Sequence, residues 1–166
     1  MGIIVQHGWR PGIIGDVVSA HTVYYAREWG FGPVFEAKVA REMAAYLDRY
    51  DLARDRLFRI DRDGTLLGSL TIDGSDPELP SGDAHLRWFI VADAFRGTGV
   101  GRLLMNAAQA FLDQAGFQSY YLTTFAGLDP ARRLYEDAGF ALTAERPSLI
   151  WGTTVIEQRF ACSHPG

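Results

Sequence analysis

Three alternating glycines between two arginines, in the segment FRGTGVGR at residues 95–102, constrain the fold more than any other feature of the sequence. The nearly continuous apolar run at 85–92 predicts a strand covered on both faces. From 100 to 115, apolar residues recur at helical spacing until Gly116, which predicts a helix with a glycine at its end. A glycine-rich turn between a strand and a helix points several backbone N–H groups at one spot, beside the positive end of the helix dipole. The segment therefore predicts a site for a phosphate, with a pyrophosphate preferred.

The spacing of the glycines separates the nucleotide-binding patterns that could use such a turn. A P-loop requires GxxxxGK followed by Ser or Thr, and no such step follows here. A dinucleotide-binding turn requires GxGxxG, but counting from Gly97 and Gly99 the third glycine position is Arg102. A turn that needs its glycines only for its shape stays open as an alternative. The charge of Arg96 and Arg102 and the strong helix that follows favour a ligand.

The rest of the chain predicts an α+β fold in one domain, residues 1–166. We expect parallel βαβ pairing around the glycine turn and a surface loop at 73–83, where two prolines and two glycines gather. Strands are expected at 3–9, 56–60, 66–72, 85–92, 120–125, 140–144 and 151–160. Helices are expected at 11–29, 34–49, 100–115 and 129–138.

Composition limits the kind of partner that the chain can have. A net charge of -4 and a pI of about 5.5 argue against a dedicated nucleic-acid binder. No stretch of about 18 apolar residues and no leader pattern are present, so we expect no membrane span and no signal peptide. Cys162, the single cysteine, cannot by itself form an internal disulfide or a zinc site. We therefore expect a cytoplasmic protein without a metal.

The glycine segment and a second motif resemble the GCN5-related N-acetyltransferases, the GNAT family. The pattern RxxGxG is similar to the family's acyl-CoA pyrophosphate loop, and ARRLYEDAGF at 131–140 resembles its second signature, an A-x-x-L-Y helix before Gly-Phe. The closest likeness in pattern is to the acetyltransferase domains found fused behind MarR-type regulators. The resemblance implies the GNAT fold: a central, mixed, mostly antiparallel sheet of about seven strands, four flanking helices, and a splayed parallel strand pair at the CoA site.

By the same resemblance, the chain is expected to be an acetyl-CoA-dependent N-acetyltransferase that moves the acetyl group directly to a primary amine in a ternary complex. The strand residues would bind the pantetheine arm through their backbone, and the loop and the following short helix would bind the phosphates. Leu128 departs from the family, which often has Asn there, and this puts one polar contact to CoA in doubt. The expected acetyl-CoA-binding residues are Phe89, Ile90, Val91, Arg96, Gly97, Thr98, Gly99, Val100, Gly101, Arg102 and Arg132.

The resemblance also implies a general acid, and the residues leave the base open. Tyr135 falls on the family's tyrosine, whose hydroxyl can protonate the departing thiolate, with a core tyrosine as the alternative. Glu36 is the first candidate for the base, and His85, acting through a water, is the second. Glu28, Trp29 and Phe31 are expected to wall the acceptor pocket.

Two further residues are also candidates for the base, but a structural role is the preferred interpretation of each. His21 falls on the apolar face of the first helix and is expected to be a core histidine with its hydrogen bonds satisfied. Glu157 alternates along the last strand and is expected to form a cross-strand pair.

The acceptor itself is not specified by any motif. A small-molecule amine and a peptide amine satisfy the same conditions, and we expect neither a nucleic-acid nor a membrane partner. Formation of a homodimer stays open. A catalytically silent acyl-CoA-binding sensor and a structural interaction protein are the alternatives to an enzyme.

Overall fold

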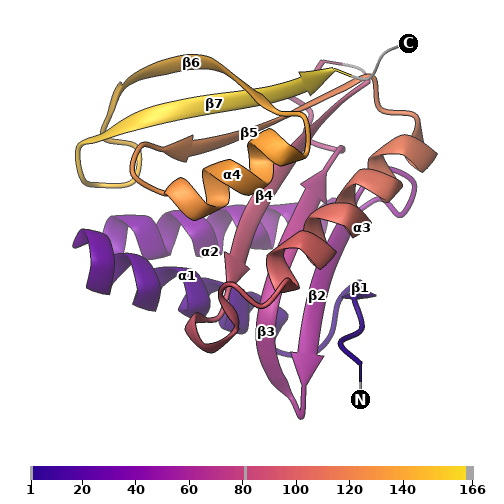
Figure 1. Cartoon of the computed structure of the whole chain (residues 1–166), viewed down its shortest axis with the longest axis horizontal. Helices are drawn as coiled ribbons and strands as arrows, with labels where there is room; N and C mark the ends of the chain where they lie inside the picture. The colour runs from indigo at the N-terminus through magenta and orange to yellow at the C-terminus, as the bar shows by residue number, and fades with distance from the viewer. Residues whose placement is uncertain (1, 81, 164–166) are drawn as a thin grey trace.

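The computed structural model describes residues 2–80 and 82–163. Within these residues it has four α-helices, one short 3-10 helix, η1 (Asp93–Phe95), and one seven-stranded sheet (Figure 1). The helices are α1 (Ile13–Trp29), α2 (Pro33–Asp48), α3 (Val100–Ala115) and α4 (Asp129–Asp137). The strands are β1 (Gln6–His7), β2 (Arg56–Arg62), β3 (Thr65–Asp73), β4 (Asp83–Val91), β5 (Ser119–Phe125), β6 (Ala141–Ser148) and β7 (Val155–Ser163).

The sheet is antiparallel except at its centre. The strand order is β1-β2-β3-β4-β5-β7-β6, and β4 and β5 are the one parallel pair in the described sheet. Their ladder joins residues 83–85 to residues 119–121 and then stops, although both strands continue. This geometry confirms the predicted mixed sheet, with four flanking helices and a splayed parallel pair.

The helices cover both faces of the sheet (Figure 1). α3 lies on one face, where Leu104 and Leu112 pack in a buried cluster with Leu70 of β3. α1 and α2 lie together on the other face, where Val17 and Met43 belong to a second buried cluster. The apolar stripes that predict these helices are thus the stripes that the sheet buries.

The helix ends follow the predicted signals. Gly116 has a φ of 76° at the end of α3, and the following Phe117 N–H donates to Leu112 O at 3.2 Å. Gly30 ends α1 in the same left-handed conformation, with a φ of 70°. Such a conformation favours glycine because a Cβ would crowd the backbone.

Two predicted strands are shorter than expected. Of residues 3–9, the ladder with β2 includes Gln6 and His7 alone, while Ile3 and Val5 pack against the core without pairing. The last strand begins at Val155 rather than 151, because the chain at 149–154 turns over α2. A Cβ on Gly152, whose φ is 87°, would lie 2.8 Å from Val34 Cβ.

A β-bulge interrupts β4 beside the point where it leaves β5. Register with β3 shifts between Thr71 and Ser69, and Trp88 has a φ of 51°. A bulge of this kind bends a strand and redirects its side chains. Residues Phe89 to Val91 therefore form a separate edge segment of β4 beyond the short parallel ladder.

Candidate active site

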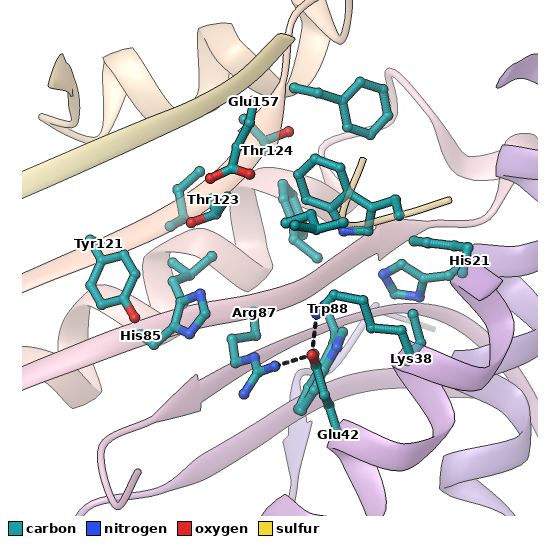
Figure 2. Close-up of a pocket in the computed structure, with 18 of the residues that line it drawn as sticks. His21, Lys38, Glu42, His85, Arg87, Trp88, Tyr121, Thr123, Thr124 and Glu157 are labelled. Carbon is teal, nitrogen blue, oxygen red and sulfur yellow. Dashed lines mark hydrogen bonds and ion pairs between the residues drawn. The ribbon is translucent and has the colours of Figure 1, made fainter. Parts of the chain in front are cut away.

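A cavity of about 330 Å³ opens where β4 and β5 separate. Side chains from both faces of the sheet and from the sheet itself line it (Figure 2). The labelled lining residues are His21 of α1, Lys38 and Glu42 of α2, His85, Arg87 and Trp88 of β4, Tyr121, Thr123 and Thr124 of β5, and Glu157 of β7. Strands that separate within a sheet expose backbone groups in such a cavity, which suits a ligand that can pair with them.

Tyr135 of α4 reaches this cavity from the α3 side of the sheet. Its side chain is 6% exposed, and its ring lies between 5.9 and 6.2 Å, centroid to centroid, from the rings of Phe89, Phe140 and Phe160. Burial, with a smaller contribution from Tyr25, raises the pKa of the Tyr135 hydroxyl above its ordinary value. The hydroxyl is thus protonated at neutral pH, as a proton donor must be.

The glycine turn forms a cradle at the start of α3. Gly97 and Gly99 have φ values of 75° and 94°, and a Cβ built on either would meet no atom within 4 Å. The first backbone bond of the helix runs from Leu103 N–H to Gly99 O at 3.0 Å. The amides of the preceding turn therefore have no partner within the helix. Val100 is fully buried in the core cluster, so it offers no side-chain contact to a ligand.

Gly101 lies in a different environment from its two neighbours. A Cβ there would lie 3.0 Å from Leu134 Cδ1 and 3.2 Å from Phe89 Cζ. The third glycine thus lets α3 approach α4 and β4, and its contact with a ligand would be through its N–H. The predicted role of all three glycines as an open cradle fits Gly97 and Gly99 best.

The predicted phosphate-binding cations have protein partners in this structure. Arg96 stacks over the ring of Tyr24, with Cζ 3.9 Å from the centroid, and Arg102 pairs with Asp137 at 3.1 Å. Arg132 pairs with Glu136 at 2.6 Å. The three guanidinium groups are exposed, and exposed ion pairs of this kind contribute about 0–1 kcal/mol. Such weak pairs leave the three side chains free to turn toward an anion.

Thr98 lies at the exposed tip of the same turn. Its hydroxyl donates a hydrogen bond to the carbonyl oxygen of Phe95. This contact closes the turn on itself and presents the glycines on either side of Thr98 to the solvent.

His85 lies at the far end of the cavity from α1, in the last residue pair of the parallel ladder. Its ring stacks on Tyr121 at 4.4 Å between centroids, with an angle of 11° between the planes. Burial, assisted by the charge of Arg87, lowers the pKa of His85 to about 3. The imidazole is therefore neutral at physiological pH, and it accepts a proton only weakly.

The floor of the cavity holds a compensated network of charges. Glu42 of α2 is paired with Lys38 and with Arg87 (Figure 2). Arg87 also reaches the fully buried Asp73 at 3.1 Å, and Arg49 binds both oxygens of Asp73 at 2.7 Å. These carboxylates thus have cationic partners, and the arginines hold the pKa of Asp73 below its ordinary value.

The predicted acceptor residues lie outside the cavity lining. Glu36 is exposed in the first turn of α2, and Glu28 is exposed and paired with Arg27 at 2.9 Å. Trp29 packs edge-on against Phe125 at 4.8 Å, and Phe31 is buried in the same aromatic cluster. Trp29 and Phe31 therefore support the Phe125 wall from behind. Their assignment as acceptor-pocket residues stays a prediction.

Two residues that the sequence placed in structural roles line the cavity instead of lying apart from it. His21 is buried, and its Nδ1–H donates to Val17 O at 2.8 Å, as a satisfied core histidine does. Its Nε2 is then the unprotonated nitrogen, and the ring lines the cavity. Glu157 makes the predicted cross-strand contact with Arg146, at 3.5 Å, but its Oε2 is buried without a hydrogen-bond partner. No local sequence signal distinguishes either residue, because their placement depends on how distant elements pack.

The comparison with known families decides the kind of protein that this site belongs to. The model of the Acetyltransferase (GNAT) family matches residues 20–140, a span that contains the glycine turn, both separating strands and Tyr135. This is more than half of the chain. The chain belongs to the GNAT acetyltransferase family. GNAT members are acyltransferases, so an acyltransferase activity follows from membership. No curated protein matches the chain in sequence.

Solved GNAT structures share the fold over nearly the whole chain. A GNAT acetyltransferase from Staphylococcus aureus Mu50 is 12% identical, with a TM-score of 0.75 over 98% of this chain and 99% of that one. Ribosomal-protein-alanine N-acetyltransferase from Brucella melitensis is 13% identical, with a TM-score of 0.76 over 97% and 99%. PaiA N-acetyltransferase from Thermoplasma acidophilum, solved with coenzyme A, is 14% identical, with a TM-score of 0.71 over 99% and 100%. At these identities the likeness shows the GNAT fold.

None of the helices in residues 2–80 and 82–163 combines the length and apolar character that crossing a membrane requires. Nor does that part of the chain bring three or more His, Cys, Asp or Glu side chains together as a metal site.

Proposed function

We propose that this GNAT protein transfers an acetyl group from acetyl-CoA directly to a primary amine in a ternary complex. The observation that carries the proposal is the meeting of the unpaired edge of β4 and the Tyr135 side chain at one cavity. When bound, acetyl-CoA would supply the activated acyl group as a thioester. The edge of β4 and the cradle of Gly97 and Gly99 fit such a ligand, because both offer open backbone and no obstructing Cβ.

The chain's own groups would divide the binding of the donor between backbone and side chains. The backbone of Phe89, Ile90 and Val91 would pair with the pantetheine arm along the open strand edge, and one N–H would polarise the thioester carbonyl. Amides at the start of α3 would hold the pyrophosphate. Arg96, Arg102 or Arg132 would add charge after leaving their surface pairs. The contacts of the pantetheine arm with β4 would thus depend little on which side chains β4 carries.

Tyr135 would act as the general acid. Its hydroxyl is buried, protonated and at the cavity, and it would donate its proton to the departing sulfur. Of the two predicted bases, His85 lines the cavity and Glu36 lies on the exposed face of α2. His85 would act by accepting a hydrogen bond from a water or the amine, since its low pKa of about 3 keeps it neutral. The acceptor's ammonium group would first lose one proton to water, because only the neutral amine can attack the thioester, and the proton released as the amide forms would return through water to Tyr135.

The finer expectations from the sequence belong to the same proposal. We infer that the relatives closest in pattern are the acetyltransferase domains fused behind MarR-type regulators, on the strength of the motifs at 87–104, 123–140 and 151–160. The proposal also includes a cytoplasmic location, supported by the single cysteine, and acetyl-CoA as a co-substrate without a metal.

The test is release of CoA thiol from acetyl-CoA in the presence of amines, amino acids and peptides, with Tyr135→Phe and Tyr50→Phe assayed in parallel. Tyr50 is a matched control because its hydroxyl is buried but lies outside the cavity lining. We expect Tyr135→Phe to lower kcat by about 100-fold with acetyl-CoA affinity nearly unchanged, and Tyr50→Phe to have no effect on kcat. Binding of acetyl-CoA without turnover of any amine would support the sensor alternative, and turnover at the wild-type rate in Tyr135→Phe would refute the acid assignment.

A further inference from the structure

Glu157 of β7 lines the cavity beside the end of β5. It is paired in register with Phe125, the last residue of β5, and its side chain extends from β7 into the cavity beside Thr123 and Thr124 (Figure 2). Tyr135 lines the same cavity from α4. The Glu157 carboxylate and the Tyr135 hydroxyl therefore bound a common space.

Glu157 differs from the two other acidic residues of the cavity lining in having a buried oxygen without a partner. Glu42 is paired with Lys38 and Arg87, and Asp76 accepts a hydrogen bond from the backbone N–H of Glu78. The cation nearest to Glu157 is Arg146, at 3.5 Å from Oε1, and the Arg146 side chain is 73% exposed. Oε2 accepts no hydrogen bond from any described residue, while the Glu157 side chain is only 13% exposed. A buried acceptor without a hydrogen bond costs about 1–3 kcal/mol of free energy. A ligand that donates a hydrogen bond to Oε2 would remove this cost and would bind more tightly for that reason.

The surroundings of Glu157 favour a cation over a neutral donor. The ring of Phe125 lies 5.5 Å from Trp151 and 5.6 Å from Tyr25, and all three rings line the cavity. Aromatic faces attract ammonium groups and keep water from a carboxylate, which strengthens the ion pair. A volume of about 330 Å³ is at the small end of the range for ligand pockets.

We propose that Glu157 binds the ammonium group of the acceptor, and that the acceptor is a small aliphatic or arylalkyl primary amine. This inference rests on the proposed function and adds the substrate class and the residue that selects it. The ammonium group would donate to Oε2, and its short apolar chain would lie against Phe125 and Trp151. The carboxylate would thereby hold the nitrogen on the acceptor side of the cavity, opposite the donor side that Tyr135 closes.

Binding is measured first, because it does not require turnover. The protein is saturated with CoA and titrated by calorimetry with n-butylammonium and benzylammonium, and separately with 1-butanol and benzyl alcohol. Glu157→Gln keeps the shape of the side chain and removes its charge. We expect this variant to bind both ammonium probes at least tenfold more weakly than the wild type and to bind the alcohols with unchanged affinity. Glu157→Asp should recover part of the affinity. Glu145→Gln, the same charge change on β6 outside the cavity lining, should bind like the wild type.

Kinetics then separate this inference from the proposed function. With an amine that is turned over, Glu157→Gln should raise the KM for the amine at least tenfold and leave the KM for acetyl-CoA unchanged. Amine binding that depends on Glu157 without any turnover would refute the transferase proposal and leave the ammonium site standing. The ammonium site is refuted if neither ammonium probe binds, or if Glu157→Gln binds both as tightly as the wild type does. A tripeptide amide with a free N-terminus that binds more than tenfold tighter than both probes would overturn the small-amine assignment.

Discussion

Acidification should destabilise this protein through the buried imidazole of His21. The side chain is 5% exposed, and its Nδ1–H is committed to Val17 O at 2.8 Å. Burial lowers the pKa of His21 to about 4, from 6.5 in an exposed histidine. Between these two pH values His21 is protonated in the unfolded chain but stays neutral in the folded chain. Stability should therefore be fully present above pH 6.5 and should fall as the pH drops toward 4.

The size of the loss follows from the gap between the two pKa values. Each pKa unit is worth about 1.4 kcal/mol, so the gap gives a loss of roughly 3 kcal/mol when the pH reaches 4 and about 2 kcal/mol at pH 5. His85, whose pKa is about 3, should add about 2 kcal/mol at pH 5 for the same reason. The wild type should thus lose about 4 kcal/mol between pH 7 and pH 5, a large part of the 5–15 kcal/mol that is typical of a folded domain.

The assay is urea unfolding at pH 7, 6 and 5, followed by tryptophan fluorescence and circular dichroism. We expect His21→Leu to lose about 2 kcal/mol less than the wild type between pH 7 and pH 5, because its folded and unfolded states bind the same number of protons at this position. His7→Gln, a change at an exposed histidine of β1, is the control and should follow the wild type. An equal pH dependence in His21→Leu and the wild type would show that His21 titrates normally in the folded state, and the reasoning from burial would be wrong.

Two further predictions concern packing and charge. Gly101→Val should lower the free energy of unfolding by about 1–3 kcal/mol in urea titrations, since the valine side chain would enter the contact between α3 and α4. Gly99→Val should instead weaken acetyl-CoA binding in calorimetry, because the valine side chain would fill the cradle. An unchanged acetyl-CoA affinity in folded Gly99→Val would contradict the cradle. Asp73→Asn should cost about 3–5 kcal/mol in the free energy of unfolding, because it removes the buried charge that Arg49 and Arg87 share; a cost below 1 kcal/mol would contradict this reasoning.

The strand, glycine turn and helix of the proposed donor side were predictable because their signals are local. A glycine turn, the strand before it and the helix after it lie within about thirty residues, and each is encoded by its own spacing. Gly99 is at the start of α3 with a φ of 94°, as an open turn requires. The different environment of Gly101 was not predictable, since it depends on Leu134 of α4, which is far from it in sequence.

The acceptor side was harder to predict because its walls come from distant segments. Trp29 and Glu36 flank the break between the first two helices, and their proximity in sequence suggested a pocket. In the structure neither Trp29 nor Glu36 lines the cavity, whereas Glu157 does, because β7 lies between β5 and β6 in the sheet. β7 pairs with a strand that is not its neighbour in the sequence, so the positions of its side chains depend on tertiary contacts. The spacing of apolar residues along the sequence carries no information about such contacts.

The short parallel ladder also affects how the protein can move. Strands β1–β4 form one hydrogen-bonded ladder and β5–β7 form another, and three residue pairs join them. Structures open first where the fewest backbone hydrogen bonds hold them. Apart from the edge strand β1, which two residue pairs hold to β2, the junction of β4 and β5 is therefore the place where the sheet opens most easily. Hydrogen exchange at residues 83–85 would report how often the two halves separate.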